Sequence, residues 1–230
     1  MKLIIAKKRV LIVAAIIILT GAVLGVFCGV GASLETFNPG EKVIVIDAGH
    51  GGIDAGVRGV STSTKESDIN LAISRQLKSY FTAAGFKVVM TRTNNGGLYG
   101  SSSSGFKKRD MQKRKQIIEE SNADMVISVH QNFCPIPSRR GGTVFFDKNS
   151  GCGRELADCI QSSINNMDEC VSKNTALTGD YFMLKCTESP SVIVECGFLS
   201  NIEDDKLLNT EEYQKQIAYA IFKGAVAYYG

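Results

Sequence analysis

The segments VIVIDAGH (residues 43–50) and MVISVH (residues 125–130) decide the expected fold, because each is a short run of mainly aliphatic residues that stops at a histidine. A run of this length and composition is typical of a buried strand, which places His50 and His130 at the C-terminal ends of two strands. In an open α/β sheet, ligands bind at that edge. These are the only two histidines of the chain, and a matched pair favours a metal site over two unrelated strand caps.

Strand-like and helix-like segments alternate along the rest of the sequence. This alternation predicts an α/β fold: a single domain with a twisted, mostly parallel mixed sheet of about six strands, flanked by helices and preceded by an N-terminal apolar helix. The expected strands are residues 43–47, 86–91, 125–130, 143–146, 181–184 and 192–195. The expected helices are residues 67–84, with Ser67 as the N-cap, 107–121, 153–167 and 211–228.

The N-terminal segment has the pattern of an export signal. Basic side chains precede residues 10–34, which carry no charge and are numerous enough to cross a bilayer as one helix. The segment is also compatible with a cleaved secretory signal, because Val30 and Ala32 are small residues where a signal peptidase reads. Basic residues before the apolar run keep the N-terminus inside and send the remainder outward. We therefore assign residues 1–34 to a signal peptide or membrane anchor, residues 35–42 to a linker and residues 43–230 to the folded domain.

Composition excludes a nucleic-acid-binding function. The formal net charge is +3, but without the four basic residues of the N-terminal segment, 22 Lys and Arg stand against 23 Asp and Glu. The exported part is thus near neutral and lacks the concentrated basic surface of a nucleic-acid binder. Its length suits one domain with one hydrophobic core.

The seven cysteines of the chain leave its disulfide pattern open. Cys28 lies in the apolar segment, and the other six lie in the domain, where they allow three disulfides in an exported protein. Against a full disulfide framework, Cys186 and Cys196 lie in strand-like apolar sequence, where free buried cysteine is common. No CxxC pair occurs, which excludes a zinc ribbon.

Carboxylates accompany the two histidines. Glu66 closes a glycine-rich stretch just before an expected helix, and Glu195 ends the strand-like run SVIVE. A catalytic zinc site uses three N or O ligands and leaves one position for water, and His50, Glu66 and His130 supply such a set. Glu195 would then be the free carboxylate that takes a proton from the attacking water and delivers it to the leaving amine.

Each of these residues also has a structural explanation. Glu66 could complement the helix dipole at a helix start, and Glu195 could be a buried carboxylate paired with a basic residue. Asn132 could bond to backbone in a loop. The spacing by itself leaves both kinds of explanation open.

Several motifs occur in an order that carries a family resemblance. They are IDAGHGGIDAG (46–56), a Glu before a helix, ADMVISVHQN (123–132), GGTVFF (141–146) and SPSVIVECGFLSN (189–201). Together they resemble the zinc-dependent N-acetylmuramoyl-L-alanine amidases of the type 3 amidase family, from about residue 43 to the C-terminus. The resemblance implies a six-stranded twisted sheet flanked by helices, and it makes residues 43–230 a zinc amidase catalytic domain.

The same resemblance implies a site and a reaction. It assigns one Zn²⁺ to His50, Glu66 and His130 and the catalytic role to Glu195. The implied reaction is hydrolysis of the amide that joins the lactyl group of N-acetylmuramic acid to L-alanine of the stem peptide.

Other residues match the family less directly. Arg92 and Arg114 match family positions, and with Asp47 and Asn132 they are candidates for substrate binding or for support of the metal ligands. For Arg92, a structural salt bridge is an equal interpretation. The sequence departs from the family at Phe133, where a small residue is usual, a change that would narrow the groove or shift Asn132.

An apolar N-terminus followed by a catalytic unit resembles the sporulation and germination amidases of this family, which act on spore cortex peptidoglycan in producing muramic-δ-lactam. The resemblance implies peptidoglycan as the substrate, a cell-envelope or forespore location, and membrane contact through residues 1–34 if they are not cleaved. The long glycine-rich approach to Glu66 also motivates the hypothesis that an activating protein partner orders this loop and controls zinc occupancy.

Two alternative functions share these features. A zinc peptidase that acts on wall peptides would have a similar metal set. A non-catalytic envelope protein could bind wall glycan through the same groove, although such a protein has no need of the complete set of four site residues.

Overall fold

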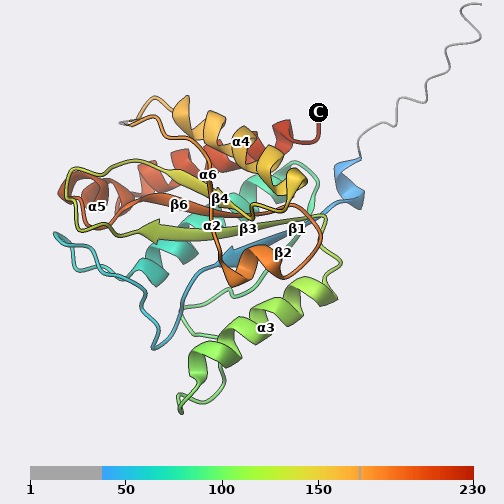
Figure 1. The fold of residues 1–230 in the computed structure, drawn as a ribbon, viewed down its shortest axis with the longest axis horizontal. Coiled ribbons are helices and arrows are strands. Elements are labelled where there is room, and N and C mark those ends of the chain that lie inside the picture. The colour runs from blue at the N-terminus through green and yellow to red at the C-terminus, as the bar shows by residue number, and fades with distance from the viewer. Residues whose placement is uncertain (1–37, 171) are drawn as a thin grey trace, which may run out of the picture. The chain divides into compact units, whose positions relative to one another are not determined.

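Within residues 38–170 and 172–230, which the computed structural model describes, a six-stranded mixed sheet forms the centre of the domain (Figure 1). Its strands are β1 (Val43–Ala48), β2 (Lys87–Met90), β3 (Met125–Asn132), β4 (Thr143–Phe146), β5 (Leu177–Thr178) and β6 (Ser191–Phe198). They lie in the order β2-β1-β3-β6-β4-β5. The first four of these run parallel, whereas β4 is antiparallel to β6 and carries β5 at the edge. The predicted α/β fold with a mostly parallel mixed sheet is confirmed.

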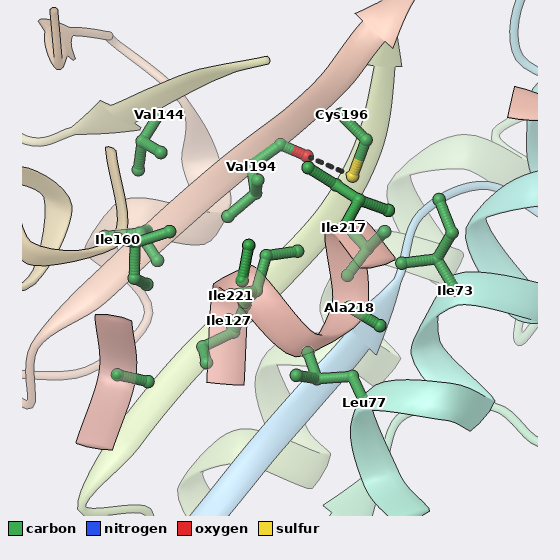
Figure 2. Close-up of a cluster of buried hydrophobic side chains, with 14 of the residues drawn as sticks. Ile73, Leu77, Ile127, Val144, Ile160, Val194, Cys196, Ile217, Ala218 and Ile221 are labelled. Atoms are coloured by element: carbon green, nitrogen blue, oxygen red, sulfur yellow. Dashed lines mark hydrogen bonds between the residues drawn. The ribbon is translucent and has the colours of Figure 1, made fainter. Parts of the chain in front are cut away.

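Helices cover both faces of this sheet. They are α2 (Glu66–Ala83), α3 (Phe106–Glu120), α4 (Gly151–Asn165), α5 (Ile202–Leu208) and α6 (Glu211–Ala227), with the 3-10 turns η1 (Pro39–Glu41) and η2 (Phe182–Lys185). On one face, side chains of α2, α4 and α6 form the main core with the sheet, as Ile73, Ile160 and Ile217 do around Ile127 (Figure 2). On the other face, α3 and η2 contribute to a smaller core, and α3 lies across the sheet from α4 and α6 (Figure 1).

The sequence of α2 explains how this helix is held. Ile69, Ile73 and Leu77 recur at intervals of four, which places them on one stripe of the helix, and all three are buried. Burial of each such side chain contributes about 1.5–3 kcal/mol. Because Glu66 is the first residue of α2, this packing also fixes where its carboxylate lies.

Three local predictions are wrong. Residues 181–184, expected as a strand, are the turn η2 and its N-cap Tyr181, and the sixth strand is the two-residue β5 instead. A strand would send Met183 and Leu184 to opposite faces, whereas both are buried in the smaller core. Helix α5 is absent from the prediction; it begins after Asn201, whose side chain accepts hydrogen bonds from the first turn. The predicted N-cap, Ser67, is the second residue of α2. The N-cap of this helix is Lys65.

The predicted signal peptide or anchor, residues 1–34, and residues 35–37 of the predicted linker lie outside the described residues. In the rest of that linker, Pro39–Glu41 form η1, and Lys42 Nζ lies 3.0 Å from Asp124 Oδ1. No helix in the described part of the chain is both long and apolar enough to cross a bilayer. The cysteines of this part are free thiols: Cys134, Cys152, Cys159, Cys170, Cys186 and Cys196.

Candidate metal centre

Three predicted ligands lie together at the carboxyl ends of the parallel strands. His130 Nδ1 lies 3.0 Å and His50 Nε2 lies 3.2 Å from Glu66 Oε1, and the three ligand atoms lie within 4.8 Å of one another. The pairing of β1 with β3 explains this approach, since both strands end at the same edge of the sheet. Two imidazole nitrogens and one carboxylate oxygen at this spacing fit a zinc ion, which takes N and O ligands at about 2.0–2.2 Å.

Glu66 is a buried carboxylate with several donors around it. The backbone N–H groups of Val57 and Gln131 donate to its two oxygens at 2.9 and 3.2 Å. Burial raises the pKa of Glu66, but hydrogen bonds to His130 and His50 outweigh burial and hold the pKa well below its usual range. The side chain is therefore anionic, as a metal ligand must be.

Two glycines allow the ligands to approach the loop. A Cβ placed on Gly49 would lie 2.3 Å from the ring of His130, and one on Gly56 would lie 2.3 Å from Glu66 Oε2. Both distances are far shorter than van der Waals contact. The glycine-rich stretch thus provides close packing around the ligands as well as its turns.

His50 sits in a strained turn, with φ 60°, a left-handed conformation uncommon for residues other than glycine. Asp54, which the sequence analysis missed, supports it: Asp54 Oδ2 lies 3.0 Å from His50 Nδ1. Burial lowers the pKa of His50, but the carboxylates of Asp54 and Glu66 raise it to about 9, so metal binding must displace a proton. In the sequence, only the short spacing of His50 and Asp54 could have indicated this contact. That spacing falls in a glycine-rich stretch and has no periodic pattern that would predict it.

Arg92 lies beneath the turn that carries His50. Its buried guanidinium donates to the carbonyl oxygens of Ala48, Gly49 and Ser67 at 2.7–2.9 Å. Among the described ion pairs none includes Arg92, so its contacts differ from the salt bridge considered from the sequence. They tie the end of β1 to the start of α2 and so hold the strand end that leads to His50.

Arg114 and Asp47 form a second buried support. Arg114, on α3, donates to Asp47 at 2.5 Å, to Asp110 at 2.7 Å and to the carbonyl oxygen of His50 at 2.6 Å. Burial raises the pKa of Asp47, but the charge of Arg114 and hydroxyl donors lower it to about 2. Both side chains are fixed by other protein groups, which makes them supports of the ligand turn.

Glu195 stands beside His130 in the register of β3 and β6. Its Oε2 atom is buried and has no hydrogen-bond partner among the described residues. None of the described ion pairs includes Glu195, in contrast to the structural explanation considered from the sequence. Burial raises the pKa of Glu195 to about 7. A buried carboxylate that titrates near neutral pH has the properties of a general base and acid.

Asn132 lies apart from these groups. It ends β3 after a shift in the register with β6, and its side-chain oxygen accepts from the backbone N–H of Phe133 at 2.8 Å. It lines a different pocket from the one that holds Glu195. Phe133 is about half exposed in that second pocket.

A pocket of about 270 Å³ opens over the ligand cluster. His50, His130 and Glu195 line it at the strand ends. One wall comes from α3 and includes Lys107 and Met111, and another comes from Tyr181 and η2. The pocket therefore joins two residues of the candidate metal site, His50 and His130, to an unpaired carboxylate and leaves space for a substrate.

Comparisons with known proteins find N-acetylmuramoyl-L-alanine amidases. The family model Amidase_3, described as N-acetylmuramoyl-L-alanine amidase, matches residues 44–227. The germination-specific N-acetylmuramoyl-L-alanine amidase of Bacillus subtilis (strain 168) is 31% identical over 192 residues, which cover 82% of this chain and 80% of the relative. The CwlD amidase from Clostridioides difficile, solved in complex with the GerS lipoprotein, has a TM-score of 0.79 at 36% identity and covers 82% of this chain and 98% of that one. The catalytic domain of CwlV from Bacillus (Paenibacillus) polymyxa var. colistinus has a TM-score of 0.72 at 25% identity over 82% and 98% of the two chains.

Proposed function

The chain belongs to the Amidase_3 family of N-acetylmuramoyl-L-alanine amidases, and from this premise we propose that it is a zinc-dependent enzyme that cleaves peptidoglycan between N-acetylmuramic acid and L-alanine. The observation that carries the proposal is the cluster of His50, Glu66 and His130, of which both histidines line the same pocket as Glu195, a residue with an unpaired carboxylate oxygen. We assign the ligand role to the first three residues and the catalytic role to Glu195.

In this mechanism the protein supplies the ligands and the proton transfer. A zinc ion held by His50, Glu66 and His130 would provide Lewis acidity to polarise the amide carbonyl and would make the attacking water more acidic. Glu195 accepts the proton of that water and returns it to the nitrogen of L-alanine as the C–N bond breaks. The products are the lactyl carboxylic acid and a free peptide amine.

The buried arginines serve this reaction indirectly. Arg92 and Arg114 hold the carbonyl oxygens of Gly49 and His50, so the imidazole of His50 stays in position although its backbone is strained. Asp47 holds Arg114 in turn. We therefore assign these three residues to support of the metal ligands.

The relatives support a proposal for the biological setting. The germination-specific amidase of Bacillus subtilis and the CwlD amidase support a role in spore cortex maturation, in which removal of the stem peptide frees a muramic acid to form muramic-δ-lactam. The chain would act in the exported, cell-envelope space of the forespore. Residues 1–34 would be the signal peptide or membrane anchor, residues 35–42 the linker and residues 43–230 the catalytic domain.

A protein partner is part of the proposal. The CwlD amidase was solved with the GerS lipoprotein, and the loop that leads to Glu66 exposes two apolar side chains, Ile53 and Val60. A partner that covers this loop would hold Glu66 and Asp54 in place and raise zinc occupancy. Full zinc content and full activity of the purified chain alone would contradict this requirement.

Digestion of purified peptidoglycan tests the amidase activity. The full chain, loaded with zinc, is expected to release stem peptides with a free L-alanine amine and to leave intact glycan. Mass analysis of the products measures both. New ends within the peptides would indicate a peptidase instead. Absence of any cleavage by the zinc-loaded chain, with and without the partner lipoprotein, would contradict the proposed reaction.

The cortex role has its own test. Spores that lack this chain are expected to contain cortex without muramic-δ-lactam. An unchanged lactam content would contradict the cortex role and leave the amidase reaction untouched.

A further inference from the structure

Charge is unevenly distributed around the metal pocket. The first turn of α3 carries Lys107, Lys108 and Arg109 and no acidic residue, and Lys107 lines the pocket. The other wall is formed by Tyr181, Phe182 and Met183, which carry no formal charge. Asp47, Asp54 and Asp110 also line the end near α3. Arg114 pairs with Asp47 and Asp110, and His50 contacts Asp54. Lys107 is thus the exposed cation of this end, and the other end is aromatic.

The strand order places these ends on opposite sides of the candidate ligands. Lys107 Nζ lies 3.5 Å from Asp54, which contacts His50 after β1. Tyr181 packs edge-on against Phe145 of β4, with ring centroids 5.6 Å apart. Because β3 and β6 lie between β1 and β4, His130 and Glu195 lie between the two ends.

Lys107 keeps donors available for a ligand. Its side chain is 69% exposed, and its ion pair with Asp54 is long at 3.5 Å. An ammonium group has three donors, so two remain when one faces Asp54. Arg114 is the other lysine or arginine among the described residues that line the pocket. It is buried and already bonded to Asp47 and Asp110.

The substrate of the proposed reaction has a matching asymmetry. It joins acetamido sugars without charge to a stem peptide that carries carboxylates. We propose that Lys107 forms a subsite for the peptide carboxylate closest to the scissile amide, that of the second residue, so that the stem peptide lies over the start of α3. Opposite charges attract most strongly where a pocket partly excludes water, and the aromatic end offers no competing cation. This inference rests on the proposed amidase function.

Paired substrates and a charge-removing variant test the subsite. The probes are a muramoyl tripeptide with the free carboxylate on its second residue and the same compound with a carboxamide there. For the free-carboxylate probe, Lys107→Met is expected to raise KM about twofold to fivefold, as loss of one exposed ion pair does, with little change in kcat. For the carboxamide probe, the same variant should resemble the wild type. Lys107→Arg should retain the preference for the free carboxylate.

Matched variants separate this role from others. Lys108→Met removes a neighbouring exposed charge outside the pocket lining and should leave both KM values unchanged. The zinc content of Lys107→Met should equal that of the wild type, which excludes an effect through Asp54. Arg139→Met removes an exposed cation of the pocket around Phe133 and should also preserve the preference.

Three outcomes would overturn the subsite: equal effects of Lys107→Met on both probes, no effect on either, or loss of the preference in Arg139→Met instead. Failure of the proposed function is a distinct result, because the zinc-loaded wild type would then hydrolyse neither probe. Binding of the two probes to Glu195→Gln, measured by calorimetry, gives the same comparison without turnover.

Discussion

His50 Nδ1 lies 3.0 Å from Asp54 Oδ2 and leaves the other ring nitrogen, Nε2, directed at Glu66. A proton held between Nδ1 and the carboxylate leaves the lone pair of Nε2 free for a metal, which is the usual support of a metal-binding histidine. The tight backbone pairing of Gly51 with Asp54 brings this carboxylate back to the ring. Asp54 is therefore a positioning residue for the candidate ligand.

Asp54→Asn should weaken zinc binding by about 10-fold to 100-fold, the range found when such outer partners are lost. Titration against a chelator of known affinity measures this change, and circular dichroism checks the fold. Asp68→Asn, which changes an exposed carboxylate on α2, is the matched control. Unchanged zinc affinity in the Asp54 variant would remove its positioning role.

His50→Ala should lose the metal itself, because two protein ligands remain where a catalytic zinc site uses three. Elemental analysis of the purified variant measures zinc per chain. The wild type should hold about one zinc per chain under the same loading conditions. Equal zinc content in the variant would take His50 out of the ligand set.

Glu195→Gln should keep zinc content near that of the wild type while hydrolysis falls by about 10²-fold to 10⁴-fold, the contribution typical of a general base and acid. The amide has a similar shape but accepts no proton. Peptidoglycan digestion and zinc analysis on one preparation make the comparison. Normal hydrolysis would contradict the role assigned to Glu195.

Gly49→Ala should displace the ring of His130, since the added Cβ would lie 2.3 Å from it. Overpacking of this kind costs about 1–3 kcal/mol, so both the melting temperature and the zinc affinity should fall. Gly151→Ala, in α4, meets nothing within 4 Å and should change neither. A Gly49 variant with wild-type values would show that the loop shifts freely.

Asp47→Asn should lower the free energy of unfolding at neutral pH by up to about 3 kcal/mol, the lower end of the range for a broken buried ion pair, because it leaves buried Arg114 with Asp110 as its remaining carboxylate partner. Urea denaturation measures the loss. Asp158→Asn breaks an exposed pair with Arg154 and should cost less than about 1 kcal/mol. Similar losses in the two variants would contradict a buried ion-pair role for Asp47.

The same ion pair predicts a pH dependence. The pKa of Asp47 falls from 3.8 to about 2 in the folded chain because the charge of Arg114 and hydroxyl donors outweigh burial. Its stabilisation is therefore complete above about pH 4 and is lost as the pH falls towards 2, by about 2 kcal/mol in total. Asp47→Asn should lose less stability than the wild type over that interval, and parallel pH profiles would contradict this.

Much of the fold could be predicted because its signals are local. Runs such as residues 43–46 and 192–194 are apolar without interruption, as buried parallel strands are. The four-residue run 181–184 is also mainly apolar, although without β-branched residues, and it forms the N-cap and most of the 3-10 turn η2. A short apolar run does not reveal whether its side chains must be buried on one side or on two. Packing against α3 decides that these residues form a turn.

The ligand cluster could be predicted from strand ends and ordered motifs, and Arg92 and Arg114 were already candidates for its support, but the groups that these arginines hold could not be predicted. Arg92 and Arg114 lie far in sequence from the carbonyl oxygens of Gly49 and His50 that they hold. Asn132 lies only two residues after His130, but the register of β3 with β6 shifts between these two residues. Asn132 does not line the pocket that His130 lines.

The sequence by itself determined the α/β class, the four residues proposed for the chemistry and the family, because strand composition and ordered motifs are properties of short stretches of chain. Only the tertiary structure decided that Asp54 supports His50, that two arginines hold the ligand turn, and that the pocket has an exposed lysine on α3 at one end and aromatic side chains at the other. These features depend on which distant segments pack together, and short stretches of sequence carry no record of that packing.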